Sequence, residues 1–233
     1  MCCTAPGDRT LKELGLKLNI IAIRFRSIMS CPPILDRTQS YTFSRYFELT
    51  ADPEEIFAEL DCRLVSQSLA LPSLAQDGAA IAGLLYRIEQ SLELVDLSSE
   101  IARRETLISP ILLEVCSRSH QKMKIEYAVN VSNLLKDSFD YFIPSPQNLL
   151  VIEAKQADMS RGFVQLGAEL IALDQWTTST VPVLYGAITT GDSWKFGRFD
   201  RTDRILIRDT RLYSVPSDLT QLVAILLGII SGL

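Results

Sequence analysis

The sequence predicts an α/β protein in which helices flank a mixed β-sheet. Apolar residues first recur at helical spacing, and the pattern then switches to short, partly alternating apolar runs that are typical of strands. The elements also follow one another in the order helix, three strands, helix, strands, helix. This order indicates an α/β sandwich with a mixed sheet.

The chain divides into three regions by pattern. Residues 1–40 combine mixed charge with the Pro32-Pro33 break and show no sustained period, so we expect a poorly ordered N-terminal extension. Met29 is a candidate for the true start of translation. We expect residues 41–96 to form a helical N-terminal subregion and residues 97–233 to form the main domain.

Helix signals set the beginnings of the expected elements. A short amphipathic helix begins at Asp52, which caps it ahead of Pro53 in the first turn. A later helix begins near Ser98 or Ser99, with a bend expected at Pro110. The expected elements are helices over residues 78–96 and 97–117, strands over 125–135, 139–143 and 149–154, a helix over 161–173, strands over 183–188 and 194–199, and a buried helix over about 218–230.

Composition argues against several classes of protein. The net charge of −5 gives no sign of a polycation that coats nucleic acid. The five cysteines include no CxxC pair, and His120 is the one histidine and has no expected role, so zinc and a disulfide framework are both disfavoured. The longest apolar run, over residues 222–230, is about half of what a bilayer span needs. We therefore expect a cytoplasmic protein with no membrane segment.

Two acidic residues and a lysine form the informative constellation. Side chains alternate along a strand, so Glu153 and Lys155 share one face of the strand over residues 149–154. If the preceding turn is centred between Pro146 and Gln147, Asp140 lies directly opposite Glu153. Opposed carboxylates repel each other, and a divalent cation held between them compensates. Oxygen ligands favour Mg²⁺ or Mn²⁺, and Lys155 beside the ion would polarise water and steady charge on a phosphate.

These residues carry a resemblance to a known family. Asp140 followed by Glu153-Ala-Lys155 at the end of an apolar strand resembles motifs II and III of the PD-(D/E)xK nuclease superfamily, with Phe139 where the family has proline. The resemblance covers roughly residues 97–200. It implies a restriction-endonuclease-like αβββαβ core, with a mixed sheet flanked by helices and the N-terminal helical extension added to it.

The resemblance also implies further site residues. The helix that starts near Glu100 is similar to the leading helix of nuclease domains related to type I restriction subunits, where a glutamate at this position helps to hold the metal. Gln165 is similar to the helix glutamine that lines the site in several subfamilies. The implied catalytic residues are Asp140, Glu153, Lys155 and Gln165, and the implied metal ligands are Asp140, Glu153 and Glu100, with Mg²⁺ or Mn²⁺ as the cofactor.

The expected function is a metal-dependent DNA endonuclease, with DNA as substrate and a homodimer as a candidate assembly. A catalytically silent domain of the same type that binds nucleic acid or protein is the alternative. A third hypothesis is a structural α/β protein that dimerises through its apolar C-terminal helix. The chain has no phosphate-loop motif, so any motor would be a separate chain.

Each expected site residue also has an ordinary structural explanation. Glu153 and Lys155 would form a surface ion pair. Glu100 or Glu105 would simply favour the positive end of a helix dipole. Gln165 would belong to a solvated helix face that also carries Arg161 and Glu169.

Positive charge for nucleic-acid contact comes from two groups of basic residues. Acidic residues at positions 200, 203 and 209 alternate with the second group, so we expect part of it to be a solvated, ion-paired loop. The first group is Arg103, Arg104, Arg118, Lys122 and Lys124, and the second is Lys195, Arg198, Arg201 and Arg204.

Overall fold

The computed structural model describes residues 33–145, 149–154 and 158–233, with the backbone alone at 149–154. Its contacts divide the chain into residues 1–36 and residues 37–233. In the first unit, residues 34–35 form a bend. Met29 and most of the expected extension lie outside the described residues.

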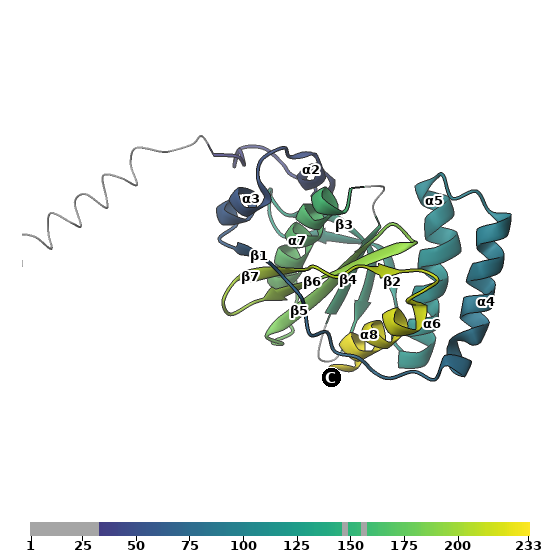
Figure 1. Ribbon diagram of the computed structural model, residues 1–233. Helices are drawn as coiled ribbons and strands as arrows, with labels where there is room; N and C mark the ends of the chain where they lie inside the picture. The colour runs from purple at the N-terminus through teal and green to yellow at the C-terminus, as the bar shows by residue number, and fades with distance from the viewer. Residues whose placement is uncertain (1–32, 146–148, 155–157) are drawn as a thin grey trace, which may run out of the picture. The chain divides into compact units, whose positions relative to one another are not determined.

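A mixed sheet forms the centre of residues 37–233 (Figure 1). Its strands are β1 (Arg63–Gln67), β2 (Lys124–Asn130), β3 (Lys136–Pro144), β4 (Leu149–Ala154), β5 (Val183–Thr189), β6 (Ser193–Asp200), β7 (Ile205–Asp209) and β8 (Tyr213–Ser214). The order is β1-β7-β6-β5-β4-β3-β2, and β8 pairs with β6. The β1–β7 and β4–β5 pairs are parallel, and the other pairs are antiparallel. The expected α/β class with a mixed sheet is confirmed.

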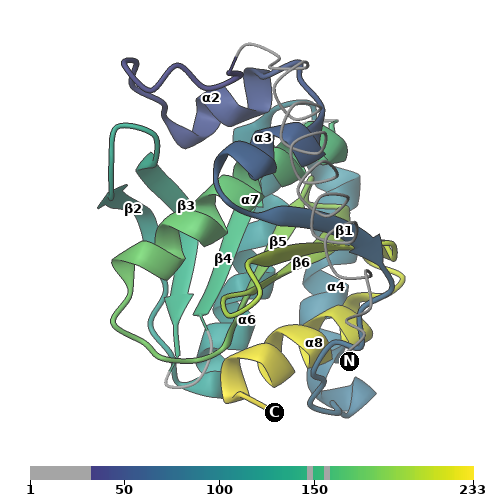
Figure 2. The ribbon, with the colours of Figure 1, turned by 90° about the vertical axis from the view of Figure 1, so that its left-hand side faces the viewer.

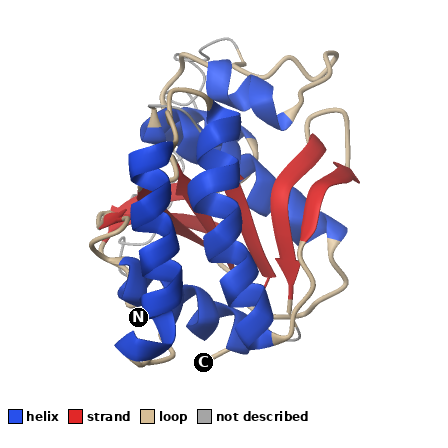
Figure 3. Ribbon diagram, turned by 90° about the vertical axis from the view of Figure 1, so that its right-hand side faces the viewer, coloured by secondary structure: helices blue, strands red, loops and turns tan. Residues whose placement is uncertain are grey.

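Helices cover both faces of this sheet (Figures 1 and 3). They are α2 (Phe43–Glu48), α3 (Pro53–Glu59), α4 (Gly78–Leu94), α5 (Glu100–Arg103), the π-helical η1 (Arg104–Ile108), α6 (Ser109–Ser119), α7 (Met159–Trp176) and α8 (Leu219–Ser231). The helices α4, α5, α6 and α8 share one face, and α2, α3 and α7 share the other.

The predicted helix signals act at the expected places. The Asp52 side chain accepts a hydrogen bond from the backbone N–H of Glu54, and α3 follows with Pro53 in its first turn. Ser99 Oγ accepts from the backbone N–H of Ala102 and caps α5. The expected bend at Pro110 takes another form, because the helix is wound as a π-helix in the turn just before this proline, which has no N–H to donate.

Helix α7 lies between the sheet and α2, and its residues 162–173 are all buried (Figure 2). The ring of Phe43 in α2 stacks on Phe139 in β3, with 5.6 Å between the ring centroids. Gln165 is 3% exposed and Glu169 is fully buried. The solvated face expected for α7 is therefore wrong for these two residues, because α7 packs against the sheet and also against α2 and α3.

Helix α8 is also buried, as its apolar run predicts. All of its residues from 222 to 230 are buried, and they pack with α4, α6 and strand side chains of the same chain. The hypothesis that α8 forms a dimer interface is therefore wrong, because this chain already covers it. Among the helices that the structure describes, none combines the length and apolarity that crossing a membrane needs.

The strands at the β1 edge of the sheet were not expected. The parallel β1–β7 pair joins Arg63 to Ile205 and Gln67 to Asp209 across a long stretch of sequence. Asp209 is fully buried, so the loop expected around the second basic group is wrong over β7. At the other edge, the strand expected over residues 125–135 ends at Asn130.

Candidate active site at the carboxyl ends of β4 and β5

Strands β3 and β4 pair in the register that the sequence predicts. Tyr141 pairs with Ile152, and continuing this ladder by one residue brings Asp140 opposite Glu153. Strand β4 runs parallel to β5, with Glu153 beside Ile188, so both strands end at the same edge of the sheet. The backbone positions of the two expected acidic residues therefore meet at this edge. Lys155 and the side chain of Glu153 lie outside what the structure describes.

Asp140 is half-buried at a local break in the β2–β3 ladder. The pairs on either side of it are regular, and the residue across from it in β2 is Glu126. Glu126 has a φ of 49°, in the left-handed region that non-glycine residues seldom adopt. Such conformations concentrate at functional sites. The sequence analysis missed Glu126, because a regular alternation of side chains gives no sign of a backbone distortion.

The elements α5, η1 and α6 form one continuous helix, residues 100–119, which is called the leading helix below. Arg104 connects this helix to β2 and β3 through hydrogen bonds. Its guanidinium donates to Glu126 Oε1 at 2.8 Å and to the Tyr141 hydroxyl at 3.3 Å, and it lies 5.1 Å from the centroid of the Tyr141 ring. Burial alone would lower the pKa of Arg104. The hydrogen bonds to Tyr141 and Glu126, together with the negative charge of Asp140, raise it above its ordinary value. Arg104 is therefore a fixed cation beside Asp140.

Two glutamates, Glu100 and Glu105, lie near the start of the helix that was expected to supply a metal ligand. Glu100 is the first residue of α5 and is half-buried, one helical turn before Arg104. Glu105 is exposed, and it lies within the π-helical turn. The role of Glu100 as a ligand stays a prediction, and its position in the first turn also suits the positive end of the helix dipole.

Gln165 lies inside the fold on α7. Its Nε2 donates to Glu169 Oε1 at 3.0 Å. Gln165 Oε1 is buried and has no hydrogen-bond partner within the described residues. A buried amide oxygen without a hydrogen-bond donor is costly, so Gln165 Oε1 is an acceptor that the described residues leave unsatisfied. The predicted role of Gln165 at the site stays a prediction.

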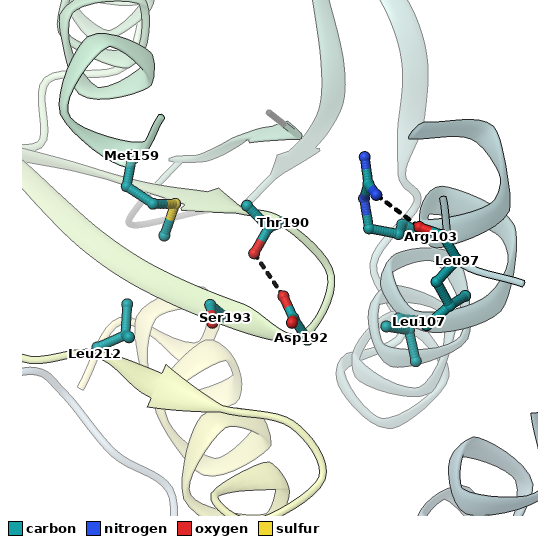
Figure 4. A pocket seen from close by; sticks show the side chains of 8 residues that line it. All are labelled: Leu97, Arg103, Leu107, Met159, Thr190, Asp192, Ser193 and Leu212. Carbon is teal, nitrogen blue, oxygen red and sulfur yellow. Dashed lines mark hydrogen bonds between the residues drawn. The ribbon is translucent and has the colours of Figure 1, made fainter. Parts of the chain in front are cut away.

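A pocket opens at the carboxyl end of β5 (Figure 4). Its volume is about 410 Å³, which falls in the range of small-molecule sites. Five segments meet there: the segment before α5, the helix α5–η1, the first residue of α7, the β5–β6 turn with the first residue of β6, and the segment between β7 and β8. The lining residues are Leu97, Arg103, Leu107, Met159, Thr190, Asp192, Ser193 and Leu212.

Comparisons with protein-family models, curated proteins and solved structures found no match to this chain. The expected roles of Asp140, Glu153 and Lys155 are supported by sequence pattern, by the strand register and by the chemistry of these residue types.

The basic residues expected to contact nucleic acid divide into two kinds. Arg201 and Arg204 are ion-paired, but their partner is Asp174 of α7, at 2.6 and 3.4 Å, and not the acidic residues that alternate with them in the sequence. Arg118 is paired with Glu114 at 2.7 Å and lies away from the strand ends. Arg103 and Arg104 differ, because they lie on the leading helix beside the pocket and beside Asp140.

Proposed function

We propose that this chain is a metal-dependent phosphodiesterase that cleaves nucleic acid, with DNA as its substrate. The observation that carries the proposal is the β3–β4 register, which continues to an Asp140–Glu153 pair at the edge where β4 and β5 end. Two carboxylates opposed on neighbouring strands repel each other unless a cation is shared between them.

The order and pairing of the elements support the same proposal. The helix α5–α6 leads into the antiparallel strands β2, β3 and β4, and α7 then connects β4 to the parallel strand β5. This is the αβββαβ order implied by the resemblance to PD-(D/E)xK nucleases. Helices lie on both faces of the sheet, as that core requires.

The donor set suits Mg²⁺ or Mn²⁺, because it consists of carboxylate oxygens. Asp140 and Glu153 would hold the ion with Glu100, and the bound ion would supply stabilisation of phosphate charge and a lowered pKa for the attacking water. Among residues whose side chains the structure describes, no group of three potential ligands occurs. The proposed set therefore depends on the Glu153 side chain.

The residues of the chain itself have separate tasks. Lys155 would orient the water and offset charge on the phosphate. Arg104, held by Tyr141 and Glu126, offsets the charge of Asp140 and keeps a cation at the strand edge. Arg103, which also lines the pocket, adds positive charge for the backbone of the substrate.

The test is cleavage of supercoiled plasmid, single-stranded DNA and RNA with Mg²⁺, with Mn²⁺ or with EDTA. We expect cleavage that requires the metal and falls about a hundredfold or more in Asp140→Asn and in Lys155→Ala. Asp137→Asn is the matched control on the same strand and should cleave like the natural chain. Unchanged cleavage in Asp140→Asn would refute the proposal. Nucleic-acid binding without cleavage would instead support the silent binding domain.

A further inference from the structure

In the pocket beside the proposed site, the polar residues of the β5–β6 turn lie between two groups of apolar residues (Figure 4). Leu107 of the leading helix, Met159 of α7 and Leu212 form apolar walls. Thr190 and Asp192, from the turn between β5 and β6, form the polar side. A slot with apolar walls and a polar edge suits a flat heteroaromatic ring better than a chain-like or fully polar ligand.

The turn that supplies the polar side is held rigidly. Thr190 N–H donates to Ser193 O at 3.0 Å, and Trp194 Nε1 donates to Gly191 O at 3.0 Å. Gly191 has a φ of 93°, and a Cβ there would come within 3.1 Å of Leu107 Cδ1. The turn therefore lies directly against the π-helical part of the leading helix. The pocket is formed before any ligand arrives, and π-helical turns often occur at functional sites.

Asp192 supplies the hydrogen-bond acceptors of the β5–β6 turn, and across the pocket Arg103 donates one of its N–H groups to Leu97 O at 2.6 Å. Asp192 Oδ1 accepts from the Thr190 hydroxyl at 2.7 Å (Figure 4). Asp192 Oδ2 accepts no hydrogen bond from the part of the chain that the structure describes. A carboxylate selects ligands that carry N–H donors, such as the exocyclic amino groups of cytosine, adenine and guanine. Thymine and uracil present carbonyl oxygens on both sides of their single N–H, and a carboxylate repels these oxygens.

The strand pairing brings the pocket and the proposed cutting position to the same edge of the sheet. Thr189, the residue before Thr190, lies beside Ala154 in the β4–β5 pair, and Ala154 directly follows Glu153. Neighbouring strands are about 4.8 Å apart, so the pocket and the acidic pair share one edge of the sheet. A phosphate at the acidic pair would bring an adjacent base to the mouth of the pocket.

We propose that this pocket holds an unpaired nucleobase with an exocyclic amino group, next to the phosphodiester that is cut. This inference rests on the proposed function and defines its substrate as nucleic acid with unpaired nucleotides. A paired base cannot enter, because its amino edge is already engaged by its partner strand.

The test measures binding of fluorescent oligo-dA, oligo-dC and oligo-dT to the full chain, with Ca²⁺ in place of Mg²⁺ so that cleavage does not interfere. We expect oligo-dA and oligo-dC to bind about tenfold more tightly than oligo-dT. Asp192→Asn should remove this preference, because an amide keeps one acceptor but replaces the other with a donor. Leu212→Trp should fill the pocket and weaken binding of oligo-dA and oligo-dC to the level of oligo-dT.

Matched controls are Asp203→Asn, at an exposed position in the β6–β7 turn, and Leu113→Trp, at an exposed position on α6. Both should keep the base preference. Equal affinity for the three oligonucleotides, or a preference that survives Asp192→Asn, overturns the pocket inference even if Mg²⁺-dependent cleavage occurs. A preference that depends on Asp192 without cleavage of any substrate supports the pocket and overturns the proposed activity. Preferential cleavage of fully paired duplex also overturns the inference.

Discussion

Replacing Gly228 with alanine should destabilise the fold, although glycine is a poor residue within a helix. Gly228 lies near the end of α8, where the segment before α4 crosses the helix and Leu74 N–H donates to Ala224 O at 2.9 Å. A Cβ at residue 228 would come within 2.5 Å of Ser73 N and 2.6 Å of Pro72 C. These are backbone atoms, so no side-chain rotation relieves the contact.

The expected magnitude follows from two opposing effects. Alanine gains up to about 1 kcal/mol over glycine in helix propensity. Overpacking costs about 1–3 kcal/mol, and an obstacle made of backbone favours the upper end of that range. We therefore expect Gly228→Ala to lower the free energy of unfolding by about 2 kcal/mol. For a chain of this length that loss corresponds to a decrease in Tm of about 4–8 °C.

Gly83→Ala in α4 is the matched control. Gly83 is exposed, and the nearest atom to a Cβ there is Arg87 Nη1 at 3.8 Å, so only the propensity gain remains. This variant should raise Tm by about 2–4 °C. Thermal and urea denaturation followed by circular dichroism measure both variants. If Gly228→Ala proves as stable as Gly83→Ala, the close packing of α8 against residues 72–73 is refuted.

Three further predictions concern single side chains. Arg104→Ala should lower the free energy of unfolding by only about 1 kcal/mol, because its partner Glu126 is half exposed. Urea denaturation measures this loss, and a loss several times larger would contradict the prediction. Asp209→Ala should cost about 2 kcal/mol, because the buried N–H of Leu69 loses its acceptor, whereas Asp209→Asn keeps an acceptor and should cost less in the same assay. Burial raises the pKa of the Cys62 thiol, so little thiolate forms at neutral pH and alkylation by iodoacetamide, followed by peptide mass mapping, should be slow until urea unfolds the chain.

Local patterns predicted much of the part of the fold that positions the site. The Asp52 and Ser99 caps, the helix over α4 and the last helix are all present, because caps and helical periodicity depend on residues only a few positions apart. The β3–β4 register was also predictable, since the number of residues between the two strands sets which residues face each other.

The surroundings of the acidic pair were not predictable in the same way. Glu126 and Arg104 meet because β2 lies next to β3 and the leading helix crosses that part of the sheet. The pocket joins Leu97, Met159 and Asp192, which are far apart in the sequence. No pattern of neighbouring residues in the sequence predicts that these three residues line one pocket.

The sequence by itself determined the helix caps, most of the helices and strands around the site, and the β3–β4 register that continues to Asp140 and Glu153, since those properties depend on short spacings. Only the tertiary structure decided that β1 joins β7, that Gln165 and Glu169 on α7 are buried, and that a pocket lies beside the strand ends. These features arise from contacts between distant segments. Whether a residue is buried or paired depends on which other segment packs against it. That segment is fixed only when the helices and sheet pack together into one core.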